Sequence, residues 1–118
     1  MPNLNTYNLE INQGATLSLV ATWRDSAGTA INLTGYTARM NVRETYSSAS
    51  AILTLTTENA GITLGGAAGT VAILISATTT AALTAPFSGV YDLELVSAGG
   101  VVTRLLQGAA TVSPEVTR

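Results

Sequence analysis

Strict alternation of apolar and polar residues recurs along this chain, and it limits the available folds more than any other feature does. In residues 16–24, every second side chain is apolar: Leu17, Leu19, Ala21 and Trp23. The same period of two returns in residues 36–44, 51–58, 70–76, 90–96 and 101–112. Successive side chains of a strand point to opposite faces, so each segment is predicted to be a strand with a core side and an outer side. We expect the last of these strands to bend at Gly108, because a glycine inside a strand often marks a bulge.

Turn signals separate these segments. They fall at residues 25–29, 33–35, 64–69 and 97–100. Short strands joined by such turns are typical of an all-β sandwich or barrel. Residues 45–50 are predicted to be a loop, and residues 76–85 leave room for one helical turn, which Ser76 or Thr78 would cap. Consecutive threonines in that segment argue against a longer helix.

The length of the chain fits a single domain over residues 1–118. Residues 1–15 are less regularly patterned, and we interpret them as an N-terminal arm or an edge strand. Such an arm often completes the sheet of a neighbouring molecule, and the alternative is a frayed terminus. Residues 113–118 are interpreted as a C-terminal tail that is either docked on a neighbour or disordered.

The composition excludes several classes of function. Charged residues make up 10% of the chain and the net charge is −2, whereas nucleic-acid binding needs a basic patch. The chain has no histidine and no cysteine, and all of its basic residues are arginines. The common nucleophile–base pairs and thiolate or imidazole metal sites therefore cannot be built. We expect no catalytic residue, no cofactor, no metal and no small-molecule substrate. The apolar stretches are too short to span a bilayer, so we expect no membrane partner either.

Charged residues on the outer sides of two predicted strands are the first candidate site. Arg39 and Arg43 share one outer face, about 13 Å apart by strand rise, and are predicted to bind a partner. They would hold either acidic residues of that partner or the chain's own Asp92, Glu94 or Glu44 across neighbouring strands. The two carboxylates at Asp92 and Glu94 lie roughly 6–7 Å apart on one strand, where pairing with arginines is favoured over acid–base catalysis.

Aromatic residues are the second candidate. Trp23, Tyr36 and Tyr91 fall on apolar faces and are predicted to contribute to the core. That leaves Tyr7 and Tyr46 as the aromatic side chains available for a partner or for a carbohydrate. Since aromatic residues make up only 5% of the chain, a flat sugar-binding platform of several rings is not expected.

Several short pieces of the chain together carry a resemblance to a known group of proteins. These pieces are Gly14 followed by the strand to Trp23, the turn at residues 25–28, "NLTGY" at 32–36, "VR" at 42–43, "YDLEL" at 91–95, and Gly108 ahead of "PEVT". The chain resembles small all-β structural proteins of tailed phages and prophages over nearly its whole length. It is similar, more loosely, to the N-terminal domain of phage baseplate upper proteins, which carry receptor-binding proteins.

The resemblance implies a fold and a role. The fold would be an immunoglobulin-like antiparallel β-sandwich of about seven to nine strands, with at most one short helical turn. The role would be that of a non-enzymatic phage virion protein, made in the bacterial cytoplasm and placed in the tail or baseplate or at the head–tail junction. There it would form a symmetric homo-oligomer and contact other virion proteins. The alternatives are a capsid decoration (cement) protein and a carbohydrate- or host-surface-binding module.

Overall fold

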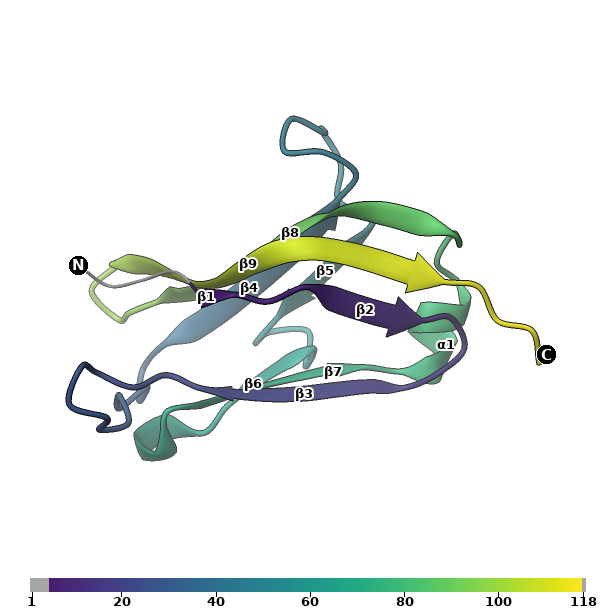
Figure 1. The fold of residues 1–118 in the computed structure, drawn as a ribbon. Helices are drawn as coiled ribbons and strands as arrows, with labels where there is room; N and C mark the ends of the chain where they lie inside the picture. Colours follow the sequence, from purple (N-terminus) through teal and green to yellow (C-terminus); the bar gives the residue numbers. More distant parts are fainter. Residues whose placement is uncertain (1–4, 118) are drawn as a thin grey trace.

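The computed structural model describes residues 5–117, which form two β-sheets packed face to face (Figure 1). The larger sheet contains β1 (Asn5–Thr6), β2 (Leu9–Asn12), β4 (Thr37–Arg43), β5 (Leu53–Thr56), β8 (Phe87–Val96) and β9 (Val102–Ser113). The smaller sheet contains β3 (Leu17–Thr22), β6 (Ile62–Leu64) and β7 (Thr70–Ile75). The predicted all-β sandwich is confirmed.

The order of strands shows how the two ends of the chain meet. In the larger sheet β8 lies between β4 and β9, β5 forms one edge, and both β1 and β2 pair with β9 at the other. All described pairings are antiparallel except those of β1 and β2, which run parallel to β9. Residues 5–12 therefore contribute edge strands to the chain's own sheet. Residues 1–4 of the predicted arm lie outside the described residues.

The core lies between the sheets and follows the predicted alternation. Leu93 of β8 and Val42 of β4 are completely buried, as is Val71 of β7 in the opposite sheet. Trp23 is partly buried against this core, and its ring meets that of Tyr36 edge to face at a centroid distance of 6.2 Å. Burial of the apolar side of every long strand is the main stabilising contribution.

A bulge in β9 lies at a different residue from the one predicted. Leu93 pairs with Leu106 but Glu94 pairs with Arg104, so the extra residue is Leu105 and not Gly108. Gly108 has another role, because a Cβ atom there would lie 2.5 Å from the backbone oxygen of Tyr7. The glycine allows the segment between β1 and β2 to approach β9 closely, and the bulge predicted at Gly108 lies at Leu105 instead.

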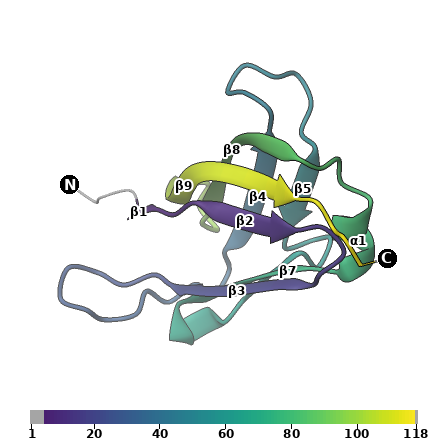
Figure 2. The ribbon, with the colours of Figure 1, turned by 45° about the vertical axis from the view of Figure 1, so that its right-hand side comes forward.

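The helical segments close the ends of the sandwich. Helix α1 (Ala77–Ala81) has the predicted cap at Ser76, whose Oγ accepts a hydrogen bond from the Thr79 amide at 3.2 Å. The buried Thr80 hydroxyl then donates to the carbonyl of Ala15 at 2.9 Å, which ties α1 to the turn before β3. Figure 2 shows α1 at the same end of the sandwich as that turn and the C-terminal segment.

A second helical segment was not expected. The 3-10 turn η1 (Gly66–Ala68) forms within the predicted glycine-rich turn between β6 and β7. Within residues 5–117, no helix is long and apolar enough to cross a membrane.

Candidate binding groove

The outer face of the larger sheet carries a polar groove of about 270 Å³. Its walls come from β4, β8, β9 and the loop after β4, and include Asn41, Arg43, Tyr46, Asp92, Glu94, Arg104 and Gln107. Strand pairing brings these residues together from distant parts of the sequence. Asp92 is paired on one side with Asn41 and on the other with Gln107, so a continuous polar row crosses three strands. We call this feature the polar groove.

The β9 bulge determines which side chains reach the polar groove. In a regular strand, residues three positions apart point to opposite faces. The extra residue Leu105 changes that count, so Arg104 and Gln107 both lie on the outer face. The Nη1 atom of Arg104 donates to Oε1 of Gln107 at 3.2 Å. Alternation alone would have assigned one of these two side chains to the core.

Two ion pairs cross the outer face, as the sequence had suggested. Arg39 Nε lies 2.8 Å from Glu94 Oε1, and Arg104 Nε lies 3.5 Å from Asp92 Oδ2. The cross-strand alternative is therefore what the structure shows for Arg39. Its side chain is 53% exposed, and an exposed pair of this kind contributes at most about 1 kcal/mol to stability.

Arg43 takes a different role from Arg39. Its Nη1 atom donates to the carbonyl of Ser48 at 3.0 Å, which fixes the loop after β4 to the sheet. Among the described residues Arg43 forms no ion pair with Asp92, Glu94 or Glu44. The guanidinium group thus borders the polar groove with its charge uncompensated by direct contact.

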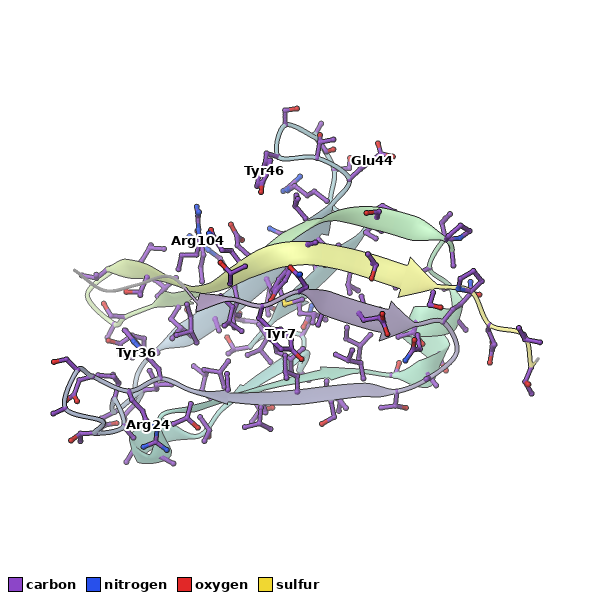
Figure 3. All side chains as sticks on the ribbon, in the orientation of Figure 1. Tyr7, Arg24, Tyr36, Glu44, Tyr46 and Arg104 are labelled. Carbon is purple, nitrogen blue, oxygen red and sulfur yellow. The ribbon has the colours of Figure 1, made fainter. Side chains whose placement is uncertain are left out.

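Tyr46 lies on the same loop. The loop projects from the larger sheet in Figure 1, and the Tyr46 side chain is 89% exposed. In Figure 3 this side chain lies on the side of the loop toward Arg104, whereas Glu44 points the other way. The structure therefore brings two of the predicted residues, Arg43 and Tyr46, to one groove.

Tyr7 is separate from that group. Its side chain is 46% exposed and does not line the polar groove. Its backbone oxygen accepts a hydrogen bond of 2.6 Å from the hydroxyl of Tyr91, which anchors the segment between β1 and β2. Burial raises the pKa of Tyr91 to about 12, with a smaller contribution from Tyr7.

The two carboxylates in the groove, Asp92 and Glu94, each lie beside arginines. Burial raises the pKa of Asp92 above its usual value, and the nearby charge of Glu94 adds to the effect. The three surrounding arginines act in the opposite direction. Each carboxylate contacts an arginine, and no metal-binding group of acidic residues occurs among residues 5–117. Both carboxylates of the polar groove thus lie in direct contact with a guanidinium group.

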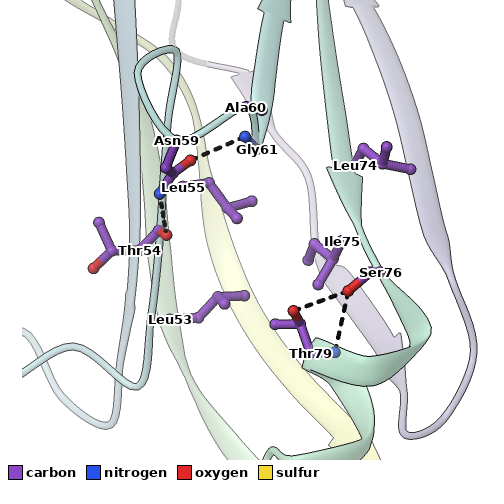
Figure 4. Close-up of a pocket in the computed structure, with 10 residues that line it drawn as sticks. All are labelled: Leu53, Thr54, Leu55, Asn59, Ala60, Gly61, Leu74, Ile75, Ser76 and Thr79. Atoms are coloured by element: carbon purple, nitrogen blue, oxygen red, sulfur yellow. Dashed lines mark hydrogen bonds between the residues drawn. The ribbon is translucent and has the colours of Figure 1, made fainter.

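A second pocket, of about 320 Å³, opens at the side of the sandwich between β5 and β7 (Figure 4). Leu53, Leu55 and Ile75 provide its apolar walls. The polar side chains at its rim already form hydrogen bonds within the protein. Asn59 Oδ1 accepts from the Gly61 amide and Asn59 Nδ2 donates to the Thr54 carbonyl, while Ser76 Oγ caps α1. We interpret this pocket as the open seam between the two sheets.

The outer face of the smaller sheet has the opposite chemistry to that of the polar groove. It consists of uncharged residues: Ser18, Val20, Thr22, Thr63, Thr70, Ala72 and Leu74. Val20 is 59% exposed and Leu74 is 52% exposed. In the described pairings β3 contacts only β7, so the other edge of β3 is open. We call this surface the neutral face.

The sheet order and the packing define an immunoglobulin-like β-sandwich. The chain is similar to a chicken TCR chain, with a TM-score of 0.55 and 10% identity, over 97% of this chain and 56% of that one. It is also similar to the extracellular domain of the voltage-gated sodium channel beta4 subunit, with a TM-score of 0.52 and 13% identity over 98% of both chains. At these identities the likeness shows the fold alone. No protein-family model and no curated protein matches the sequence.

Proposed function

We propose that this protein is a non-enzymatic structural component of a phage virion. Its place would be in the tail or baseplate or at the head–tail junction, among copies of itself and other virion proteins. The resemblance to small phage proteins supplies the virion setting. The neutral face is the observation that supports assembly.

The argument from the neutral face is physical. A strand at the edge of a sheet presents unpaired backbone groups, and monomeric proteins usually protect such edges with charge, proline or a bulge. β3 has none of these over Leu17–Thr22, and the adjoining face exposes Val20 and Leu74 among hydroxyl and methyl groups. Contact with a neighbouring subunit would cover both the edge and the face without burying a charge.

The predicted contacts of Arg39 and Arg43 with a partner support this proposal less strongly than the neutral face does. Arg39 is already engaged by Glu94, and only Arg43 is left to meet an acidic partner residue. If Arg39 and Arg43 nevertheless form assembly contacts, replacing both with alanine will lower the amount of protein incorporated into particles.

The position in the particle is tested by immunogold labelling of purified virions in the electron microscope. Gold at the tail tip supports the baseplate position, and gold along the head supports the alternative of a decoration protein. Absence of gold from particles, with intact protein in the infected cell, would refute the virion proposal.

The role of the neutral face is tested by a matched pair of substitutions. Val20→Glu places a charge on the neutral face, whereas Thr37→Glu places the same charge on an exposed position of β4 in the larger sheet. We expect Val20→Glu to reduce incorporation into particles and Thr37→Glu to leave it unchanged. Equal incorporation of both purified, folded variants would remove the neutral face as an assembly surface.

A further inference from the structure

We propose that the polar groove binds a neutral saccharide. The site is formed by side chains of β4, β8 and β9 together with Tyr46 on the loop above them. This inference does not depend on the virion proposal, because it rests on a different face of the molecule. It gives the loop after β4 a ligand-binding role.

The balance of charge in the polar groove favours a neutral ligand. Asp92 and Glu94 contribute two negative charges to its lining, and Arg43 and Arg104 contribute two positive charges. An anionic ligand would meet two carboxylates, and a cationic ligand would meet two guanidinium groups. A ligand without charge avoids both penalties and can still use every polar group as a hydrogen-bond partner.

Unused hydrogen-bonding capacity gives the second argument. The side-chain oxygens of Asn41 and Gln107 already accept bonds from Thr54 and Arg104, but their amide nitrogens donate to no other group within residues 5–117. Each carboxylate has a second oxygen available beside its arginine contact. Donors and acceptors thus lie side by side in the groove. Sugar hydroxyls match such a mixture, because each one both donates and accepts.

Tyr46 provides the third argument. Its ring is almost fully exposed at the rim of the groove, so its apolar face is accessible to a ligand. The loop that carries it is anchored by the bond from Arg43 to Ser48, and by a 3.0 Å bond from the Thr45 amide to Ser48 Oγ. An aromatic ring at the rim of a polar groove can cover the C–H face of a sugar while the groove binds its hydroxyls.

The size of the polar groove limits the ligand. Its volume of about 270 Å³ lies just below the roughly 300–1,000 Å³ of sites for drug-sized molecules. One sugar ring, as a terminal residue of a longer glycan, fits that space better than an internal segment of several rings does. We therefore expect weak binding of a single sugar and a gain in apparent affinity when several copies of the protein are assembled.

The test is an NMR titration of the full-length, ¹⁵N-labelled protein with D-glucose, D-galactose, D-mannose, L-rhamnose and N-acetyl-D-glucosamine, with N-acetylneuraminic acid as the anionic comparison. A glycan array probed with the same protein extends the panel. At least one neutral sugar should cause saturable shifts confined to residues 41–48, 90–94 and 104–107. Tyr46→Ala should weaken binding about tenfold or more, whereas Tyr46→Phe should retain it, because the ring and not the hydroxyl makes the contact.

The control substitution is Tyr7→Ala, which removes an exposed tyrosine that lies outside the groove and should leave sugar affinity unchanged. Folding of each variant is checked by the rest of its NMR spectrum, since Tyr46 is too exposed to support the core. The proposal is overturned if no neutral sugar on the array or in the titration binds. Binding of N-acetylneuraminic acid alone, or binding that survives Tyr46→Ala, would also overturn it.

Discussion

The hydroxyl of Tyr91 should stabilise the protein by joining the first strands to the rest of the larger sheet. Tyr91 is 5% exposed, and its hydroxyl donates a 2.6 Å hydrogen bond to the backbone oxygen of Tyr7. Tyr91→Phe keeps the ring and leaves that oxygen without its partner, which costs about 1–2 kcal/mol of unfolding free energy. For a domain of this size the corresponding fall in Tm is roughly 3–6 °C for each kcal/mol.

The assay is urea denaturation at pH 7, followed by the fluorescence of the single tryptophan, Trp23, and by far-ultraviolet circular dichroism. Tyr36→Phe is the matched control, because the Tyr36 hydroxyl makes no hydrogen bond within residues 5–117 and its ring contact with Trp23 is retained. We expect the control to change the free energy of unfolding by less than about 0.5 kcal/mol. Equal losses in both variants would refute the reasoning.

The same hydroxyl also predicts a pH dependence. In the unfolded chain tyrosine ionises near pH 10, whereas burial raises the pKa of Tyr91 in the folded protein to about 12. The unfolded state therefore releases this proton first, and its contribution to stability is complete below pH 10 and is lost as the pH rises toward 12. Tyr91→Phe should remove this part of the alkaline loss. If the variant and the parent lose stability equally over that interval, burial of the hydroxyl is not the cause.

Other substitutions test the core, the contact between β2 and β9, and the groove carboxylate. Leu93→Ala, at a fully buried position, should cost about 2–5 kcal/mol in urea denaturation, whereas Leu74→Ala, at a residue 52% exposed, should cost less than about 1 kcal/mol. Gly108→Ala should separate β2 from β9, because the new Cβ meets the Tyr7 backbone, and hydrogen exchange should then be faster in residues 9–12. Asp92→Asn should leave Tm at pH 7 unchanged or slightly raised, because the folded state disfavours the ionised form of Asp92.

The sequence was sufficient to predict the layers of the fold because the apolar period of two is uninterrupted in most strands. Leu17, Leu19 and Ala21 lie on the inner side of β3 as that period requires, and Ser76 caps the predicted helical turn. The pairing of β1 and β2 parallel to β9 was not predictable in the same way. It depends on contact between residues that are about a hundred positions apart, and alternation within one segment carries no information on its partner.

The groove was only partly predictable for a related reason. Arg39, Arg43, Asp92 and Glu94 could be assigned to outer faces, and Arg39 does pair with Glu94. Gln107 was missed because the bulge at Leu105 reverses the alternation in β9. The only sign of this bulge in the sequence is the pair of adjacent leucines at 105 and 106, both of which are buried. Tyr46 comes close to Arg104 because of the path of the loop after β4. The alternation of apolar and polar residues predicts strands and gives no information about the path of a loop.

The chemistry of the two outer faces suggests that they serve separate contacts. The two ion pairs and the polar groove lie on the larger sheet, whereas β3, β6 and β7 carry no charged residue at all. Because the two sheets pack through their inner sides, these surfaces face away from each other, and one can be covered by a neighbouring subunit while the other stays open. If both proposals hold, Val20→Glu should impair incorporation into particles without changing sugar affinity, and Tyr46→Ala should do the reverse. If either substitution impaired both properties in folded protein, a single shared interface would have to replace the two surfaces proposed.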